Sequence, residues 1–367
     1  MDCEKEMQKA MSRFQKIAAQ LDANSLDAML ITSAPNRFYT TGFASSDGTA
    51  VITRDGSYFF IDCRYIEAAQ KAVSDADIRL ATAEKPAVEQ AAELLKERGI
   101  KRLGFEDSYA TVKEYNRWQE KFEGCELVPA AQMLADLRMI KEPEELESMT
   151  AAQRIAEKAL TEVLEFIKPG RTEQEIAAFL QYRMLLHGAK KMSFDPIVVA
   201  GPNSSMPHGV PTARPLADGD FLTMDFGCIY NGYCSDMTRT VAIGHVTEEM
   251  EKVYATVLEA QLAGIAAAHG GVIGKTVHEA AAKVIADAGY GEYFGHGFGH
   301  SLGVEVHENP RFSTLNDKPV PAGAVLSAEP GIYLPGQFGV RIEDVIIVGE
   351  TESKSIMEAS KELLILH

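Results

Sequence analysis

The feature that most constrains the fold of this 367-residue chain is an internal repeat at a fixed offset of 104 residues. The segment "PGRTEQEIAA" (169–178) aligns with "IGKTVHEAAA" (273–282), and "DGDFLTMDFG" (218–227) aligns with "AGAVLSAEPG" (322–331). Both blocks keep one offset without a gap, which chance similarity rarely does. Each half is predicted to contain two helices followed by a strand hairpin. Two such halves should pack about a pseudo-two-fold axis, with sheets inside and helices outside.

The repeat relates acidic residues of the two halves. Asp225 aligns with Glu329, and each has a second acid downstream, Asp236 and Glu343. All four lie in apolar hairpin sequences. Acids gathered in such surroundings repel one another and are costly to desolvate unless cations neutralise them. The pattern therefore predicts a metal site. The alternative, four solvated surface acids, leaves their repeat-related positions unexplained.

The first hairpin predicts how its two acids meet. Asn231-Gly232 lies between them, and this dipeptide is the strongest short signal for a two-residue type I′ turn. With that turn Asp225 faces Thr238, so Asp225 and Asp236 share one face as diagonal neighbours, roughly 7–8 Å apart at most. In the second hairpin, the loop "PGQFG" (335–339) leaves the register open.

A glycine-rich stretch, "GHGFGHSLGVEVHENP" (295–310), precedes the second hairpin and contains His296, His300 and His307. It is not a dinucleotide-binding loop, because the sixth position counted from Gly297 is leucine. One imidazole from this stretch could complete a shell of oxygen ligands. One nitrogen with four carboxylates suits Mn²⁺, Co²⁺, Fe²⁺ or Zn²⁺. Four carboxylates can also bridge two ions, an arrangement used for hydrolysis.

The chain before the repeat is predicted to be a separate α/β domain. Helices are expected over 4–21 and 86–98, and strands over 28–32, 50–53, 58–61, 78–82 and 102–106, with 50–53 and 58–61 forming a hairpin. A long helix from Pro143 to about Ile167 opens the second part. The predicted domains are 1–140 and 141–367.

Composition excludes several classes of protein. The net charge of −17 argues against a nucleic-acid partner, and no apolar run approaches the roughly 18 residues of a membrane span. The N-terminus has no apolar signal-peptide region. The five cysteines form no CxxC pair, so reduced thiols and a cytoplasmic location are expected. The predicted hairpin register puts Cys228 and Cys234 on opposite faces, which argues against a disulfide between them.

Several motifs together resemble the pita-bread metallopeptidases, and within them the proline-specific branch of Xaa-Pro aminopeptidases and Xaa-Pro dipeptidases. These motifs are "PHGVPT" (207–212), "MDFGCIYNGYCSDMTRT" (224–240), the stretch 295–310, "EPGIY" (329–333) and "GVRIED" (339–344). "NRFYTTGF" (36–43) and "DCRYIEAA" (62–69) resemble the creatinase-type N-terminal domain of that branch. The resemblance implies an α/β N-terminal domain followed by an α+β pita-bread domain.

The resemblance also implies roles for individual residues. Two divalent ions, manganese foremost, would be held by Asp225, Asp236, His300, Glu329 and Glu343, with Asp236 and Glu343 bridging. Catalytic roles fall on His208, His307, Glu329 and Arg341, and substrate binding on His296. Ser327 departs from the family pattern, which has threonine there, but keeps the hydroxyl. The other histidines are expected on the surface or in packing: His187, His245, His269, His278 and His367.

The activity implied is hydrolysis of the bond before proline, in peptides with proline second, by a hydroxide held between the two ions. His307 would stabilise the oxyanion and Glu329 would transfer the proton. A homodimer is also implied. The alternatives are a creatinase-like enzyme without metal, a methionine aminopeptidase, and a non-catalytic binding protein of the same fold. The sequence leaves open whether dipeptides or longer peptides are preferred, and offers His296 and Arg341 as contacts for a substrate carboxylate.

Overall fold

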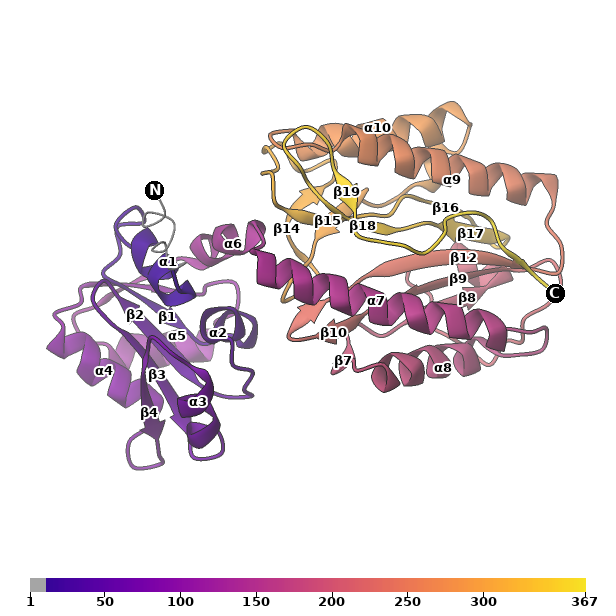
Figure 1. Cartoon of the computed structure of the whole chain (residues 1–367). Coiled ribbons are helices and arrows are strands. Elements are labelled where there is room, and N and C mark those ends of the chain that lie inside the picture. The colour runs from indigo at the N-terminus through magenta and orange to yellow at the C-terminus, as the bar shows by residue number, and fades with distance from the viewer. Residues whose placement is uncertain (1–10) are drawn as a thin grey trace, which may run out of the picture. The chain divides into compact units, whose positions relative to one another are not determined.

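The computed structural model describes residues 11–367, which form two compact units (Figure 1). The first unit ends at Leu137, and the second spans Arg138–His367. No helix among the described residues is long and apolar enough to cross a membrane.

The first unit is a six-stranded sheet with helices on both faces, in the order β4-β3-β2-β1-β5-β6. Its strands are β1 (Ala28–Ile31), β2 (Thr49–Thr53), β3 (Ser57–Asp62), β4 (Asp77–Ala81), β5 (Arg102–Phe105) and β6 (Glu126–Pro129). Its helices are α1 (Arg13–Gln20), α2 (Ala34–Thr41), α3 (Ile66–Ala72), α4 (Ala87–Glu97) and α5 (Val112–Lys121). The helix α6 (Ala131–Met139) contains the boundary between the two units. The predicted strands and the β2–β3 hairpin are confirmed.

Alternation along β1 explains the two covered faces. Met29 packs in the same apolar cluster as Phe14 of α1, whereas Leu30 packs with Leu94 of α4. Of the helix predicted over 4–21, residues 4–10 lie outside the described part. In the described part the helix begins only at Arg13, because the Ser12 side chain caps it by accepting a hydrogen bond from the Gln15 backbone N–H.

The second unit places its main strands between two helix pairs, α7 with α8 and α9 with α10 (Figure 1). The helices are α7 (Pro143–Phe166), α8 (Glu173–Leu186), α9 (Glu248–Ala267) and α10 (Gly274–Asp287), with short 3₁₀ turns η1 (Gly201–Ser205) and η2 (Gly291–Tyr293). The long helix predicted from Pro143 is confirmed. Two apolar cores result. Met224 packs with Leu180 of α8 in one, and Leu326 packs with Val257 of α9 in the other.

The second unit contains two larger sheets, each built mainly from one half of the repeat. The first, in sheet order, is β20 (Ile365–Leu366), β12 (Met237–Ile243), β9 (Phe221–Phe226) and β8 (Ile197–Ala200). The second is β14 (Glu308–Phe312), β13 (Gly299–Ser301), β15 (Val325–Ala328), β18 (Asp344–Ile347) and β19 (Lys354–Ser355). Smaller sheets are β11 (Tyr233–Cys234), β10 (Cys228–Tyr230) and β7 (Lys191–Met192), and the pair β16 (Gly331–Leu334) and β17 (Phe338–Arg341).

The internal repeat is visible in backbone detail. Gly219 and Gly323, which the 104-residue offset aligns, both have φ of +84°. Each N–H also donates a 2.7 Å hydrogen bond to a corresponding carbonyl, that of Ile243 or Val348. A left-handed backbone at both positions explains the glycine in both copies. The predicted fold class, an α/β domain followed by a pita-bread domain with an internal repeat, is confirmed.

One aligned pair differs between the halves. Thr172 caps α8 and forms a capping box with Glu175. Its counterpart Thr276 lies inside α10, which begins two residues earlier at Gly274. The aligned threonines therefore do different things, and sequence similarity overstates the symmetry at this point.

Candidate active site

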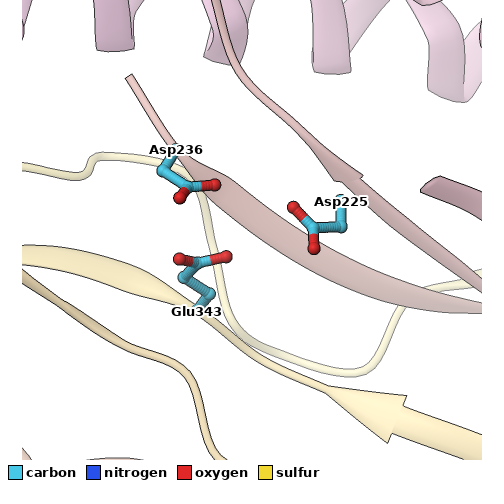
Figure 2. Close-up of side chains that lie close together, drawn as sticks. All are labelled: Asp225, Asp236 and Glu343. Atoms are coloured by element: carbon cyan, nitrogen blue, oxygen red, sulfur yellow. The ribbon is translucent and has the colours of Figure 1, made fainter. Parts of the chain in front are cut away.

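Three acidic side chains of the second unit converge at one point. Asp225 lies on β9, Asp236 directly precedes β12 and Glu343 directly precedes β18. One carboxylate oxygen from each lies within 4.8 Å of the other two, and Figure 2 shows the three groups pointing toward a common centre. The residues are only 9, 4 and 1% exposed, respectively. Both halves of the repeat thus deliver buried acid to the same place.

The first hairpin has the register that its turn predicts. Thr238 pairs with Asp225, and Tyr230 pairs with Tyr233 across Asn231-Gly232. Asn231 and Gly232 both have positive φ, 48° and 85°, as a type I′ turn requires. The predicted register is therefore confirmed.

The same register separates the two cysteines of the hairpin. The Cys228 thiol contacts the carbonyl of Ala152 on α7, whereas the Cys234 thiol contacts that of Val304. Both are free thiols on opposite faces, as predicted.

Thr238 joins the two halves beside the acids. Its backbone carbonyl accepts a hydrogen bond from the Glu343 N–H at 3.2 Å, and its hydroxyl donates to Glu343 Oε2 at 2.7 Å. The Glu343 carboxylate is therefore anchored to the strand that begins beside Asp236.

The acidic group is chemically incomplete without a cation. Asp225 Oδ1 and Glu343 Oε1 are buried and have no hydrogen-bond partner among residues 11–367. Burial, reinforced by the neighbouring carboxylates, raises the pKa of Asp236 and of Glu343 well above the usual range. Buried polar atoms are nearly always satisfied in proteins. Unpaired carboxylate oxygens at one point are ligands that divalent cations accept, so the residues present fit such ions.

His300 and Glu329 lie at the edge of this group, turned toward each other. His300 Nε2 is 3.2 Å from Glu329 Oε1 and 3.7 Å from Asp236 Oδ2. Neither residue belongs to the set of three within 4.8 Å. Burial alone would lower the pKa of His300, but the hydrogen bond to Glu329 and the nearby carboxylates raise it to about 9. Burial alone would raise the pKa of Glu329, but the hydrogen bond from His300 and the charge of that ring outweigh burial and lower the pKa. The two form a charged pair.

Ser327 fixes this pair. Its hydroxyl donates to Glu329 Oε1 at 2.9 Å and accepts from the His300 backbone N–H at 3.0 Å. The strands approach closely here, because a Cβ on Gly299 would lie 1.9 Å from the Ser327 carbonyl oxygen. This contact explains one glycine of the 295–310 stretch. The serine hydroxyl performs a positioning role that the departure from threonine leaves intact.

Arg341 is buried beside Asp225, and its guanidinium is already occupied. It donates to Asp225 Oδ2 at 2.5 Å, to the Tyr333 hydroxyl at 2.8 Å and to the Thr238 hydroxyl at 3.1 Å. The Tyr333 hydroxyl in turn lies 3.0 Å from His296 Nε2. Because these partners occupy the guanidinium N–H groups of Arg341, the side chain is poorly placed to bind a substrate carboxylate.

The sequence reasoning missed Tyr333. A signal existed, because strand alternation puts residues 329, 331 and 333 on one face. Tyr333 therefore could have been placed near Glu329 from period two alone.

A cavity of about 810 Å³ opens over the acidic group. All nine residues that the sequence singled out line it: His208, Asp225, Asp236, His296, His300, His307, Glu329, Arg341 and Glu343. The His300 and His307 rings are in edge contact, with centroids 4.4 Å apart. The cavity wall does not include the other five histidines, His187, His245, His269, His278 and His367.

Arg311 is a second cation on the cavity wall that sequence reasoning missed. It belongs to β14, pairs across the sheet with His300 and is exposed. Within residues 11–367 its guanidinium has no ion pair. No local pattern marks it, because its availability depends on what the fold leaves around it.

Two family descriptions match the chain. "Metallopeptidase family M24" matches residues 147–350, and "Creatinase/Prolidase N-terminal domain" matches residues 13–140. Among curated relatives, an uncharacterized peptidase of Bacillus subtilis is 42% identical over 93% of this chain and 96% of its own length. A Xaa-Pro dipeptidase of Pyrococcus furiosus is 34% identical over 96% of this chain and 99% of its own length.

Solved structures agree in fold over nearly the whole chain. A Xaa-Pro dipeptidase from Bacillus anthracis superimposes with a TM-score of 0.93 at 37% identity, covering 96% of this chain and 99% of that one. An X-Pro aminopeptidase from Thermotoga maritima superimposes with a TM-score of 0.88 at 33% identity, covering 93% of this chain and 98% of that one.

Proposed function

The chain belongs to metallopeptidase family M24, and on that premise we propose that it is an exopeptidase that hydrolyses the bond before proline in peptides with proline second. The observation that carries the proposal is the buried acidic group. Asp225, Asp236 and Glu343 meet within 4.8 Å beneath a cavity large enough for a short peptide. The similarity to a Xaa-Pro dipeptidase and to an X-Pro aminopeptidase supports the substrate class.

The proposed ligands of two divalent ions are Asp225, Asp236, His300, Glu329 and Glu343. Divalent ions in such a site lower the pKa of water and draw electrons from a carbonyl oxygen. The oxygen-rich donor set suits manganese, which we propose as the ion. Both unsatisfied carboxylate oxygens, on Asp225 and Glu343, support this assignment.

Glu329 is the proposed proton carrier. The Ser327 hydroxyl donates to its Oε1 at 2.9 Å, so the carboxylate is fixed in one direction. An ionised carboxylate beside the reacting carbonyl can accept a proton from water and return it to the leaving nitrogen.

His307 is the proposed donor to the developing oxyanion. Burial, and then the neighbouring His300, lower its pKa, so the ring is neutral near pH 7. A neutral imidazole still offers one N–H to an oxyanion on the cavity wall. His208, which lines the same cavity, is proposed as a further contact to the substrate. His296, whose Nε2 is 3.0 Å from the Tyr333 hydroxyl, is proposed to bind substrate as well.

Arg341 acts in this scheme as a positioning residue for Asp225. Its side-chain contact holds one oxygen of that carboxylate and leaves the other directed into the acidic group. Arg311, in contrast, carries a positive charge on the cavity wall that has no ion-pair partner among residues 11–367. We assign to Arg311 the substrate carboxylate, which in an Xaa-Pro dipeptide is the α-carboxylate of the proline itself.

Metal removal and reloading tests the activity. The protein is stripped with a chelator, reloaded with Mn²⁺ and assayed on Xaa-Pro dipeptides, Xaa-Pro-Yaa tripeptides and matched Xaa-Ala peptides. Reloaded wild type should cleave only the proline peptides, and Asp236→Asn should cleave none. Undiminished cleavage by metal-stripped Asp236→Asn, or equal rates on Xaa-Ala peptides, would falsify the proposal.

Arg311→Met tests the length preference in the same assay. With a carboxylate bound at this guanidinium, kcat/KM for the dipeptide should fall about 10- to 100-fold, as expected for loss of a charged hydrogen bond. The tripeptide, whose carboxylate lies one residue further on, should lose less. Equal losses on both peptides would remove Arg311 from the carboxylate site. The homodimer and the cytoplasmic location stay predictions.

A further inference from the structure

A buried cluster of charged side chains lies behind the histidine loop, apart from the proposed metal ligands. It consists of Arg138, Lys141, Glu305 and Glu308. The side chains of Arg138, Lys141 and Glu308 are only 7, 1 and 5% exposed. Arg138 donates to Glu308 Oε1 and, at 2.8 Å, to Glu305 Oε2. Lys141 Nζ donates to Glu308 Oε2 at 3.1 Å. The two positive charges and the two negative charges of the cluster therefore cancel.

Lys141 holds both ends of the loop that carries His307. Besides Glu308, its ammonium donates to the Ser301 hydroxyl at 3.2 Å. Ser301 and Glu308 are paired across β13 and β14, and the register shifts by a bulge between His300 and Ser301. The Lys141 ammonium group therefore contacts the residue at each end of this loop. His300 lies directly before one end, and His307 directly before the other.

The loop is also tied to the first hairpin at Gly303. Its carbonyl accepts a 2.7 Å hydrogen bond from the N–H of Cys234, two residues before Asp236. A Cβ on Gly303 would lie 2.9 Å from Glu308 Oε1 and 3.0 Å from Lys141 Cε. The backbone is thus packed directly on the ion pair, and only glycine fits without displacing it.

Packing alone does not account for charge at this position. Well-packed apolar residues of the same volume are often as stable as a buried ion pair. What charged donors and acceptors add is direction, because each bond fixes an angle as well as a distance. The loop they fix holds the His307 ring 4.4 Å from the His300 ring.

We propose that the Lys141–Glu308 ion pair is a positioning device that sets His307 against His300 over the acidic group. The inference deepens the proposed function, on which it rests. Neither residue lines the cavity, so both act through the loop. Loss of the pair would let the loop shift, and displacement of a catalytic group by about 1 Å can cost roughly 100-fold in rate.

The test is the double variant Lys141→Met with Glu308→Gln, which removes the pair and leaves Arg138 balanced by Glu305. The matched control is Arg183→Met with Glu162→Gln, a partly buried pair of the same unit that does not line the cavity. Metal content and thermal unfolding establish that each protein is folded and loaded. The double variant should lose about 10- to 100-fold in kcat with KM little changed, because His307 acts on the transition state. The control should match wild type in both.

A second readout does not depend on activity. The imidazole signals of His307, assigned by their loss in His307→Asn, are followed by NMR in the same proteins. They should shift or broaden in the double variant while those of exposed His245 stay in place. A folded double variant with wild-type kcat, or with unchanged His307 signals, overturns the proposal. A wild type that cleaves no Xaa-Pro peptide contradicts the proposed function instead, and the imidazole readout still decides the positioning role.

Discussion

The two hairpins of the second unit bring acids to one point through different registers. In the first, the two-residue turn at Asn231-Gly232 sets Asp225 opposite Thr238, and Asp236 approaches from the diagonal position. Both acids here are aspartates with short side chains. Diagonal neighbours on one face lie roughly 7–8 Å apart or less, so these two short carboxylates can still face a common centre.

The second hairpin is wider. Leu334 pairs with Phe338, which leaves a three-residue connection with Gly336 at a φ of 71°. The register is the same on both sides of a gap in the ladder, at Gly331–Arg341 and at Ala328–Asp344, so it sets Glu329 opposite Glu343.

At that gap the backbone turns to other partners. The Glu329 N–H donates to the Phe298 carbonyl at 2.8 Å, and the Glu343 N–H donates to the Thr238 carbonyl. Both acids in this hairpin are glutamates. The comparison shows that two hairpins of different register both supply the centre: the first contributes Asp225 and Asp236, and the second contributes Glu343. Glu329 stays at the edge, where it pairs with His300.

Shortening an acid in the wider hairpin should have the largest effect. Glu343→Asp withdraws the carboxylate by one methylene, which breaks its 2.7 Å contact with Thr238 and its reach toward Asp225 and Asp236. We expect kcat/KM to fall by about 100-fold or more, because a shift of about 1 Å at a reacting centre costs that much. Glu350→Asp, exposed at the end of the same hairpin, is the control. Wild-type activity in Glu343→Asp would show that length does not matter there.

The halves also differ in how they hold their histidine loops, and this predicts a smaller effect. Glu173 is fully buried and accepts hydrogen bonds from the N–H of Ala200 at 2.7 Å and of Thr212 at 2.9 Å. The loop between these residues carries His208. Glu173→Gln removes the charge from the carboxylate that closes the loop, so we expect roughly 10-fold lower kcat/KM and about 1–3 kcal/mol lower stability.

A matched control for that variant lies on the same helix turn. Glu175 belongs to the capping box of α8 but is exposed and does not contact the loop residues. Glu175→Gln should cost no more than about 1 kcal/mol of unfolding free energy and leave kcat/KM unchanged. Chemical denaturation and steady-state kinetics measure both variants. Equal kinetics for Glu173→Gln and Glu175→Gln would mean that the loop does not depend on the buried carboxylate.

The smallest effect is confined to acid pH. Burial would raise the pKa of Glu308, but Lys141 and Arg138 hold it below the ordinary value of 4.5. A carboxyl with a lowered folded-state pKa contributes stability that is present above its unfolded-state value and is lost as the pH falls through the folded-state value. Below about pH 4.5 the unfolding free energy of wild type should therefore fall more steeply than that of Glu308→Gln. Urea unfolding measures this free energy for both proteins between pH 6 and pH 3. An equal fall with pH in wild type and in Glu308→Gln would contradict the lowered pKa.

The sequence predicts the first hairpin better than the second for a physical reason. Asn-Gly permits positive φ at both turn positions, so it fixes one register, and that register is confirmed. "PGQFG" is compatible with several connections, so the placement of Glu329 opposite Glu343 required the folded chain. Helix α2 was missed, although the Ser33 cap and the proline in its first turn were readable.

Tertiary surroundings limit what sequence can say about the site. Sequence reasoning named Arg341 as a contact for the substrate carboxylate. In the folded chain its guanidinium N–H groups donate to Asp225, Tyr333 and Thr238 instead. It passed over Arg311, whose guanidinium has no ion pair within the described part of the chain. Residue type identifies a cation, whereas its partners, which come from distant segments, decide whether it is available.

The most direct test of the account counts the metal ions bound per chain. Wild type and Asp236→Asn are stripped, reloaded with Mn²⁺, freed of excess ion and measured by elemental mass spectrometry. Convergence of both halves on one centre predicts two ions per wild-type chain and a loss of tightly bound metal in the variant. A wild-type chain that binds no metal, or a variant that retains as much as wild type, would contradict it.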